Sequence, residues 1–359
     1  MNLQIYHETA QILGGFRQAG PAPRISIAPW ETASTVLDLA AGIAVFLAAV
    51  SLLRSRSRRR LFAGVVVVSA ALMTLVLTLP ALTRSGTGEP GRPAPEAAAV
   101  FLGIALCVAF ATVWAEILTN SDRGADSPDA AERFERRFSP IAIRIALWLA
   151  VAAGLLLCGV TSATIAAGLV SLLLLALSSR RRRSDFARRA AAVVILVFVL
   201  GSSLAARPHP DDGGRAASLP SLPPTWTVAV DAFRHFPYVG SGLGTFPDAF
   251  RRAQPRELPG LIVRADSALL ELLVTGGSAG VALAVIAALS LFVLFWRAWR
   301  SQRHREETAM TLAGLGALLF WALASLGGSA TSSLTTLPAL TAVCGMSWAA
   351  SQARGVRLP

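Results

Sequence analysis

Charged residues are scarce in this sequence. Only 15% of its 359 residues are charged and 54% are apolar, whereas about a quarter of the residues in a soluble globular domain are charged. The apolar residues also form uninterrupted runs of about twenty, the length that a helix needs to cross the hydrocarbon core of a bilayer. The composition therefore excludes an ordinary soluble protein and predicts an all-α integral membrane protein.

Lysine is absent, and all 33 basic residues are arginines. A net charge of +12 would also suit a nucleic-acid-binding protein, but most of these arginines lie in short connections between apolar runs, where they orient membrane helices. We therefore expect no nucleic-acid partner. Cysteine is scarce too: Cys107, Cys158 and Cys344 all lie inside apolar runs, which predicts small buried side chains with neither a disulfide nor a metal.

The apolar runs predict a single polytopic domain over residues 1–359, a helical bundle of about nine transmembrane helices. Two long runs are each divided, one by a tight turn at Gly159–Thr164 and the other by a break at Gly276–Gly277, which leaves 267–275 as a separate helical segment near the membrane surface. The predicted spans are 33–53, 61–82, 97–118, 141–159, 163–179, 188–206, 277–296, 308–326 and 334–350.

The placement of arginine predicts the orientation, because connections rich in arginine stay in the cytoplasm. Alternate connections hold 22 of the 33 arginines once Arg144 and the C-terminal tail are counted with them. These connections are 54–60, 119–140, 180–189 and 297–307. The pattern places the N-terminus outside and the C-terminus in the cytoplasm.

One long connection, residues 207–266, is predicted to be extracytoplasmic, and a loop of this length is more often functional than a mere linker. Pro223, Pro224 and Thr225 are typical of a helix start, and the apolar residues that follow recur at helical spacing, as in a helix lying on a membrane surface. A second short amphipathic helix is predicted over 247–254, with a proline in its first turn.

Between these two short helices lies FPYVGSGLGTF, with glycines at Gly240, Gly242 and Gly244. Closely spaced glycines can cradle a phosphate or form a tight turn. A nucleotide cradle would follow a buried strand and open a helix packed on a sheet, and neither is predicted here. We therefore expect a sharp turn between the two helices, with close approach of its backbone to a lipid diphosphate left open.

No ionisable residue falls at the centre of a predicted span. Asp38 lies near the outer end of the first span, and Glu116 and Arg144 lie near cytoplasmic ends, from which long side chains can reach water. This disfavours an ion-coupled transporter, which uses a carboxylate near the midplane. The ionisable residues gather at the outer face instead: Asp231, His235, Arg251, Arg252, Arg256, Arg264, Asp266 and Glu271.

Two motifs in and after the long loop carry a family resemblance. Trp226 to Phe246 reads W-x-x-A-x-x-x-F-x-x-F-P-x-x-G-x-G-x-G-T-F, and Ala265 to Gly280 reads A-D-S-A-L-L-E-L-L-V-T-G-G-x-x-G. This order of loop, glycine-rich motif and following helix resembles the O-antigen ligase/polymerase family of bacterial membrane glycosyltransferases. The segment ISIAPWETASTVLDLAAGIAVFLA resembles the family's entry from an outer loop into a helix, and SSLTTLPALTAVCGMSW resembles the family's last span.

The resemblance implies a function at the outer face of the bacterial inner membrane, in lipopolysaccharide or other cell-surface polysaccharide biosynthesis. Members move a glycan from an undecaprenyl-diphosphate carrier to a hydroxyl of a saccharide acceptor, with membrane lipids around them and without a metal or other cofactor. Arginines suit the charge of the diphosphate leaving group, and a positioned base suits the acceptor hydroxyl. The implied diphosphate- and glycan-binding residues are Arg251, Arg252, Arg256, Arg264, His235, Gly240, Gly242 and Gly244.

The sequence departs from the family pattern in three places. Asp266 stands where the family has histidine, Ser162–Ala163 stands where a serine-arginine-glycine is usual, and the chain begins at what resembles an internal outer loop of the family. Asp266 is therefore either a general base in place of histidine or the N-cap of the helix that follows. The arginines either bind diphosphate or contact lipid head groups. The two hypotheses kept are an active transferase and a catalytically degenerate member that binds glycan lipid or partner proteins.

Overall fold

The computed structural model describes residues 26–83, 95–123, 130–179, 224–255, 262, 264–301, 305–328 and 336–352. These residues form ten helices and no strand. In chain order the helices are α2 (Pro29–Leu52), α3 (Arg56–Thr83), α4 (Pro95–Arg123), α5 (Ala130–Leu157), α6 (Thr161–Ser179), α8 (Pro224–His235), α9 (Phe246–Ala253), α10 (Ala268–Ser301), α11 (Arg305–Gly327) and α12 (Thr336–Gln352).

The predicted fold class is confirmed: the described chain is a polytopic bundle of apolar helices. Eight of the nine predicted spans coincide with described helices, and the ninth, 188–206, lies outside the described residues. Within the described ranges, six helices are long and apolar enough to cross a membrane, and α5 contributes a shorter apolar stretch, Ile141–Leu157. The predicted turn between α5 and α6 is present, with Gly159 at φ 69°.

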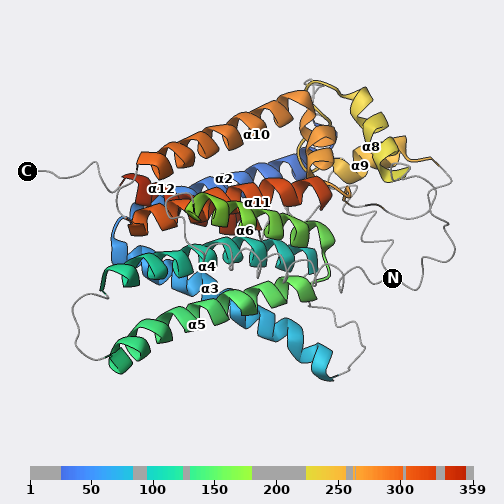
Figure 1. Cartoon of the computed structure of the whole chain (residues 1–359). Coiled ribbons are helices and arrows are strands. Elements are labelled where there is room, and N and C mark those ends of the chain that lie inside the picture. Colours follow the sequence, from blue (N-terminus) through green and yellow to red (C-terminus); the bar gives the residue numbers. More distant parts are fainter. Residues whose placement is uncertain are drawn as a thin grey trace, which may run out of the picture.

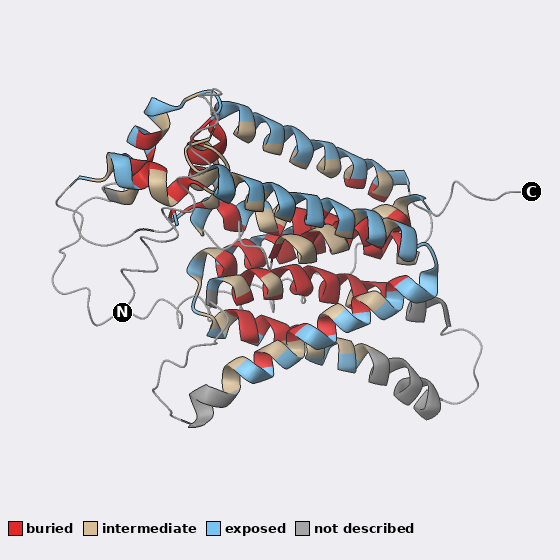
Figure 2. Ribbon diagram, turned by 180° about the vertical axis from the view of Figure 1, so that it is seen from behind, coloured by how far each residue is buried: buried red, intermediate tan, exposed pale blue. Residues whose placement is uncertain are grey.

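Helices α4 and α11 form the centre of the bundle (Figure 1). The most apolar 18-residue stretch is 78% buried in α4 and 72% buried in α11, but only 11% buried in α2 and 6% buried in α10. Figure 2 shows the exposed faces of these outer helices as long pale stripes. Leucine, isoleucine and valine dominate those faces, as expected of helices that a bilayer surrounds.

Small residues allow α4 and α11 to approach closely, as is common between membrane helices. Gly103 on α4 faces the ring of Phe320 on α11, and a Cβ added there would lie 2.0 Å from the Cζ atom of that ring. On α11, Gly314 faces Ser347 of α12 in the same way, at 2.4 Å from Oγ. The close contact between α4 and α11 therefore depends on Gly103 having no side chain.

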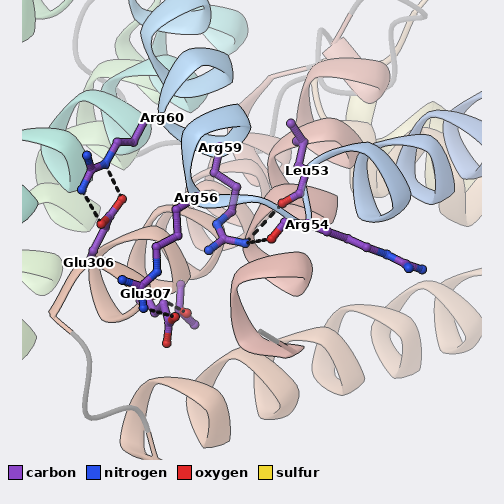
Figure 3. A network of polar contacts seen from close by, with 8 residues as sticks. Leu53, Arg54, Arg56, Arg59, Arg60, Glu306 and Glu307 are labelled. Carbon is purple, nitrogen blue, oxygen red and sulfur yellow. Dashed lines mark hydrogen bonds and ion pairs between the residues drawn. The ribbon is translucent and has the colours of Figure 1, made fainter. Parts of the chain in front are cut away.

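The two ends of the bundle differ in their contacts. At one end, Arg56 pairs with Glu307 at 3.1 Å and Arg60 with Glu306 at 2.6 Å, joining the start of α3 to the start of α11 (Figure 3). At the other end, helices α8 and α9 pack beside the start of α10 (Figure 1). The starts of α3 and α11, which belong to two connections that the arginine pattern assigns to the cytoplasm, therefore meet at one end, and α8 and α9 lie at the other.

Replacing Gly103 by alanine should destabilise the bundle by about 1–3 kcal/mol, because the aromatic ring of Phe320 would have to move within a packed core. Gly64 on α3 is the matched control, because an added Cβ there meets nothing within 4 Å, and alanine is the better helix former. Thermal unfolding of the two purified variants tests this. Equal melting temperatures would contradict the packing described.

Candidate functional site

The described part of the long loop folds into a small core of its own against the start of α10. Its members are the inward-facing apolar residues of α8, α9 and the first turns of α10: Val228, Ala229, Ala232, Phe246, Ala249, Phe250, Ala265, Leu270 and Val274. The rings of Phe246 and Phe250 lie 5.4 Å apart and are both buried. The two predicted short helices are therefore present, and their apolar faces meet each other and α10.

Helix α10 is broken at Gly277, where the backbone leaves the helical region at φ 63° and ψ −167°. The sequence-based prediction of a break at Gly276–Gly277 is confirmed. A break of this kind leaves carbonyls at the end of the first half and amides at the start of the second half without helical partners. In a membrane protein such groups must find partners within the protein.

The glycine-rich loop provides these partners. Four backbone hydrogen bonds join the loop to the two sides of the break: Ser241 N to Val274 O at 3.0 Å, Gly242 N to Thr275 O at 2.9 Å, Ser278 N to Pro237 O at 2.9 Å and Ala279 N to Tyr238 O at 3.1 Å. The loop thus donates to the first half of α10 and accepts from the second half. We call this arrangement of residues 237–242 and 274–279 the backbone seal.

Two glycines make the seal possible because two backbones meet there without side chains. Gly240 has φ 75° and Gly277 has φ 63°, both in the left-handed region. A Cβ added to either residue would lie 2.5 Å from the backbone nitrogen of the other. The positive φ of Gly242 and Gly244 likewise confirms the predicted sharp turn.

The start of α2 holds the opposite side of the loop. Ile27 N donates to Ser241 O at 3.0 Å, and the Thr32 hydroxyl donates to Leu243 O at 2.9 Å. The Ser26 hydroxyl lies 2.7 Å from that of Thr32. Sequence reasoning missed these contacts, although the segment ISIAPWETAS carries part of the family resemblance.

The amides of residues 240, 241 and 242 all donate to backbone carbonyls, Gly240 to Phe236 O at 3.1 Å and the other two across the seal. A phosphate cradle is built from amides that point at the ligand. All three amides therefore have partners within the protein, as expected if the motif forms a turn.

Asp266 is an exposed residue between two buried neighbours, Ala265 at 4% and Ser267 at 2% exposure. Ser267 donates its hydroxyl to Ser325 O at 3.0 Å, and Ala268 N donates to Gly328 O at 3.1 Å, which ties this segment to the end of α11. The first helical residue is Ala268. Ser267 rather than Asp266 therefore occupies the position directly before the helix.

The side chain of Asp266 is held from a second direction by α8. The Thr225 hydroxyl, in the first turn of α8, donates a hydrogen bond to Oδ2 of Asp266. Sequence reasoning assigned Thr225 only to the start of this helix. The carboxylate of Asp266 is thus exposed. Hydrogen bonds hold both the backbone that follows it and its Oδ2 atom.

The remaining predicted site residues lie on the same small unit. Arg264 is exposed two residues before Asp266, Arg251 and Arg252 are exposed in the last turn of α9, and His235 is exposed at the end of α8. The Nδ1 atom of His235 lies 2.9 Å from the backbone oxygen of Asp231. Arg256 lies outside the described residues.

The glycine-rich loop and the ionisable residues thus belong to the same small unit of α8, α9 and the start of α10, but they occupy different parts of it. Gly240, Gly242 and Gly244 pack against α2 and the break in α10, whereas Asp266 lies at the start of α10 and contacts α8. Among the residues that the structure describes, no three His, Cys, Asp or Glu side chains gather as a metal site would require.

The fold and this unit define a class: a polytopic helical membrane protein whose long loop seals a broken helix at one end of the bundle. Residues 145–285 match the family model described as O-antigen ligase. The match extends from the apolar part of α5 into α10 and includes the whole of the long loop. Through this segment the chain is similar to the O-antigen ligase family. A search of curated proteins found no match to the chain.

Gly240→Ala should lower stability by about 1–3 kcal/mol, because the left-handed backbone and the nearby Thr275–Gly277 backbone leave no room for a Cβ. Gly280→Ala is the matched control, since a Cβ there meets only the Leu272 side chain at 3.9 Å. Thermal unfolding and limited proteolysis of the loop provide the measurements. A Gly240→Ala protein as stable and as protease-resistant as Gly280→Ala would show that the seal is not required.

Proposed function

We propose that this protein transfers a glycan from a polyprenyl-diphosphate carrier, of the undecaprenyl type, to a hydroxyl of a saccharide acceptor at the outer face of the bacterial inner membrane. The product belongs to lipopolysaccharide or another cell-surface polysaccharide. The observation that carries this proposal is the fixed, exposed carboxylate of Asp266, which lies with exposed arginines inside the segment that matches O-antigen ligases.

In this reaction Asp266 accepts the proton of the acceptor hydroxyl. The acceptor oxygen forms a bond to the anomeric carbon of the glycan, and the bond from that carbon to the carrier diphosphate breaks. The electron pair of the broken bond leaves with the diphosphate, which gains negative charge. Arg264, Arg251 and Arg252 stabilise that charge, a role for which the planar guanidinium group is well suited.

Two features support this assignment of roles. Within the described part of the chain no ion pair engages Arg251, Arg252 or Arg264, so these guanidinium groups are available to an anionic ligand. Thr225 binds Oδ2 of Asp266, which fixes the carboxylate and directs Oδ1 to a bound acceptor. A general base must lie within hydrogen-bonding distance of the proton that it accepts before its basicity matters.

A degenerate member that only binds glycan lipid or partner proteins is the alternative, and Asp266 in place of the family histidine favours it. The two functions differ in what Asp266 does. If Asp266 is the base, removing its charge abolishes turnover and leaves carrier binding intact. If the protein only binds, wild type shows no turnover.

Asp266→Asn should reduce transfer by on the order of a hundredfold or more, the typical contribution of a general base. Arg264→Ala and Thr225→Val should each reduce it by about tenfold, the scale of one hydrogen bond to a charged group. Transfer is measured with purified full-length protein, a polyprenyl-diphosphate glycan and a saccharide acceptor.

Asp231→Asn is the matched control for this series, because Asp231 is an exposed acid on α8 that has no proposed role. Its transfer rate should equal that of wild type. Equal losses of transfer rate in Asp231→Asn and Asp266→Asn would show that Asp266 is not the base. Carrier binding by wild type without any turnover would establish the alternative function.

The orientation proposed with this function has the N-terminus outside and the C-terminus in the cytoplasm. A periplasm-active reporter fused after Gly214 should therefore be active, since that residue falls in the long loop. A reporter at residue 303, in the α10–α11 connection, should behave as cytoplasmic. The opposite pattern of activities would place the site on the wrong side of the membrane for this reaction.

A further inference from the structure

A second candidate site lies at the end of the bundle opposite the glycine-rich loop. It is a cavity of about 370 Å³ between α3, α4, α5 and α11. Its lining includes Arg60, Glu306, Glu116 and Arg144, all close to ends of predicted spans that the arginine pattern assigns to the cytoplasmic side. This is the level at which phospholipid head groups meet the hydrocarbon core.

Two ion pairs line the cavity. Arg60 binds Glu306 through two hydrogen bonds of 2.6 Å, and Arg144 lies 3.1 Å from Glu116 while donating to Thr112 O at 3.0 Å. The side chains of Glu306 and Glu116 are only 17% and 18% exposed. The cavity therefore presents two positive and two negative groups, and its lining carries no net charge.

Most of the remaining lining is apolar, and part of it faces outward. Val68 of α3 is 49% exposed and Ile143 of α5 is 59% exposed, so the cavity wall continues onto the lipid-facing surface. Figure 1 shows α3 and α5 crossing on this side of the bundle. Gly64 leaves open space in the lining, because a Cβ added there meets nothing within 4 Å.

We propose that this cavity binds one phospholipid with a zwitterionic head group of the phosphatidylethanolamine type. Its phosphate binds the guanidinium groups of Arg60 and Arg144, and its ammonium group binds the carboxylates of Glu306 and Glu116. Its acyl chains lie on the apolar wall near Val68 and Ile143. This proposal is independent of the glycan transfer proposed above, because the cavity lies at the other end of the bundle.

The balance of charge is what selects this occupant. An anionic head group would compete with Glu306 and Glu116 for the two guanidinium groups and has no cation to offer the carboxylates that it displaces, and like charges at close range are repulsive. A small soluble zwitterion would leave the apolar wall in contact with water. A zwitterionic phospholipid satisfies both charges and covers the apolar wall, which continues directly onto the lipid-facing surfaces of α3 and α5.

Full-length protein reconstituted in vesicles of equal parts phosphatidylethanolamine and phosphatidylglycerol, with identical acyl chains, tests the proposal. After mild detergent extraction, native mass spectrometry counts the lipids that remain bound. Wild type should retain one phosphatidylethanolamine. Gly64→Leu should retain on the order of tenfold less, because leucine fills the cavity. Val65→Leu is the matched control, an adjacent position that is 55% exposed and outside the lining.

A second variant keeps the test decisive if Gly64→Leu folds poorly. The double variant Glu116→Gln/Arg144→Gln adds no volume to the lining, removes one positive and one negative charge, and should also lose the bound lipid. Retention of phosphatidylethanolamine in both variants at the wild-type level overturns the site. Preferential retention of phosphatidylglycerol by wild type overturns the choice of a zwitterionic head group.

Discussion

The break in α10 at Gly277 is the constraint on which the rest of the loop depends. A backbone group left without a partner in a membrane environment costs several kcal/mol, so an interrupted helix needs another segment to complete its hydrogen bonds. Residues 237–242 do so on both sides of the break. The loop that resembles a phosphate cradle in sequence is instead the structural partner of a broken helix.

This seal fixes the position of everything around it. The loop is held on its other side by the start of α2, through Thr32 and Ile27, so three segments far apart in the chain meet at the glycines. The first half of α10 then runs back from the seal to Ser267, which is bound to the end of α11. Asp266 therefore directly precedes a segment that hydrogen bonds anchor at both ends.

Much of this architecture follows from local sequence patterns. Apolar runs predict the spans, Gly276–Gly277 predicts the break, and helical spacing after Pro224 predicts α8, because each of these features depends on neighbouring residues. The positive φ at Gly240 follows from glycine chemistry. The predicted span 188–206 and Arg256 lie outside the described residues and stay predictions.

Pairings between distant residues could not be predicted in this way. The hydrogen bond from Thr32 to Leu243 spans 211 residues of sequence, and the bond from Thr225 to Asp266 joins α8 to the segment that precedes α10. The same is true of the ion pair between Arg144 of α5 and Glu116 of α4. Such contacts are set by how helices pack, and hydrophobic periodicity carries no information about them.

The central claim is that Asp266 acts as the base at the position where the resembling family has histidine. Transfer by Asp266→His and Asp266→Asn, measured side by side, tests it most directly. Near pH 8 a histidine of ordinary pKa is neutral and basic, so Asp266→His should retain measurable transfer while Asp266→Asn loses it. Equal transfer by the two variants would contradict the claim, because the asparagine side chain cannot accept the proton.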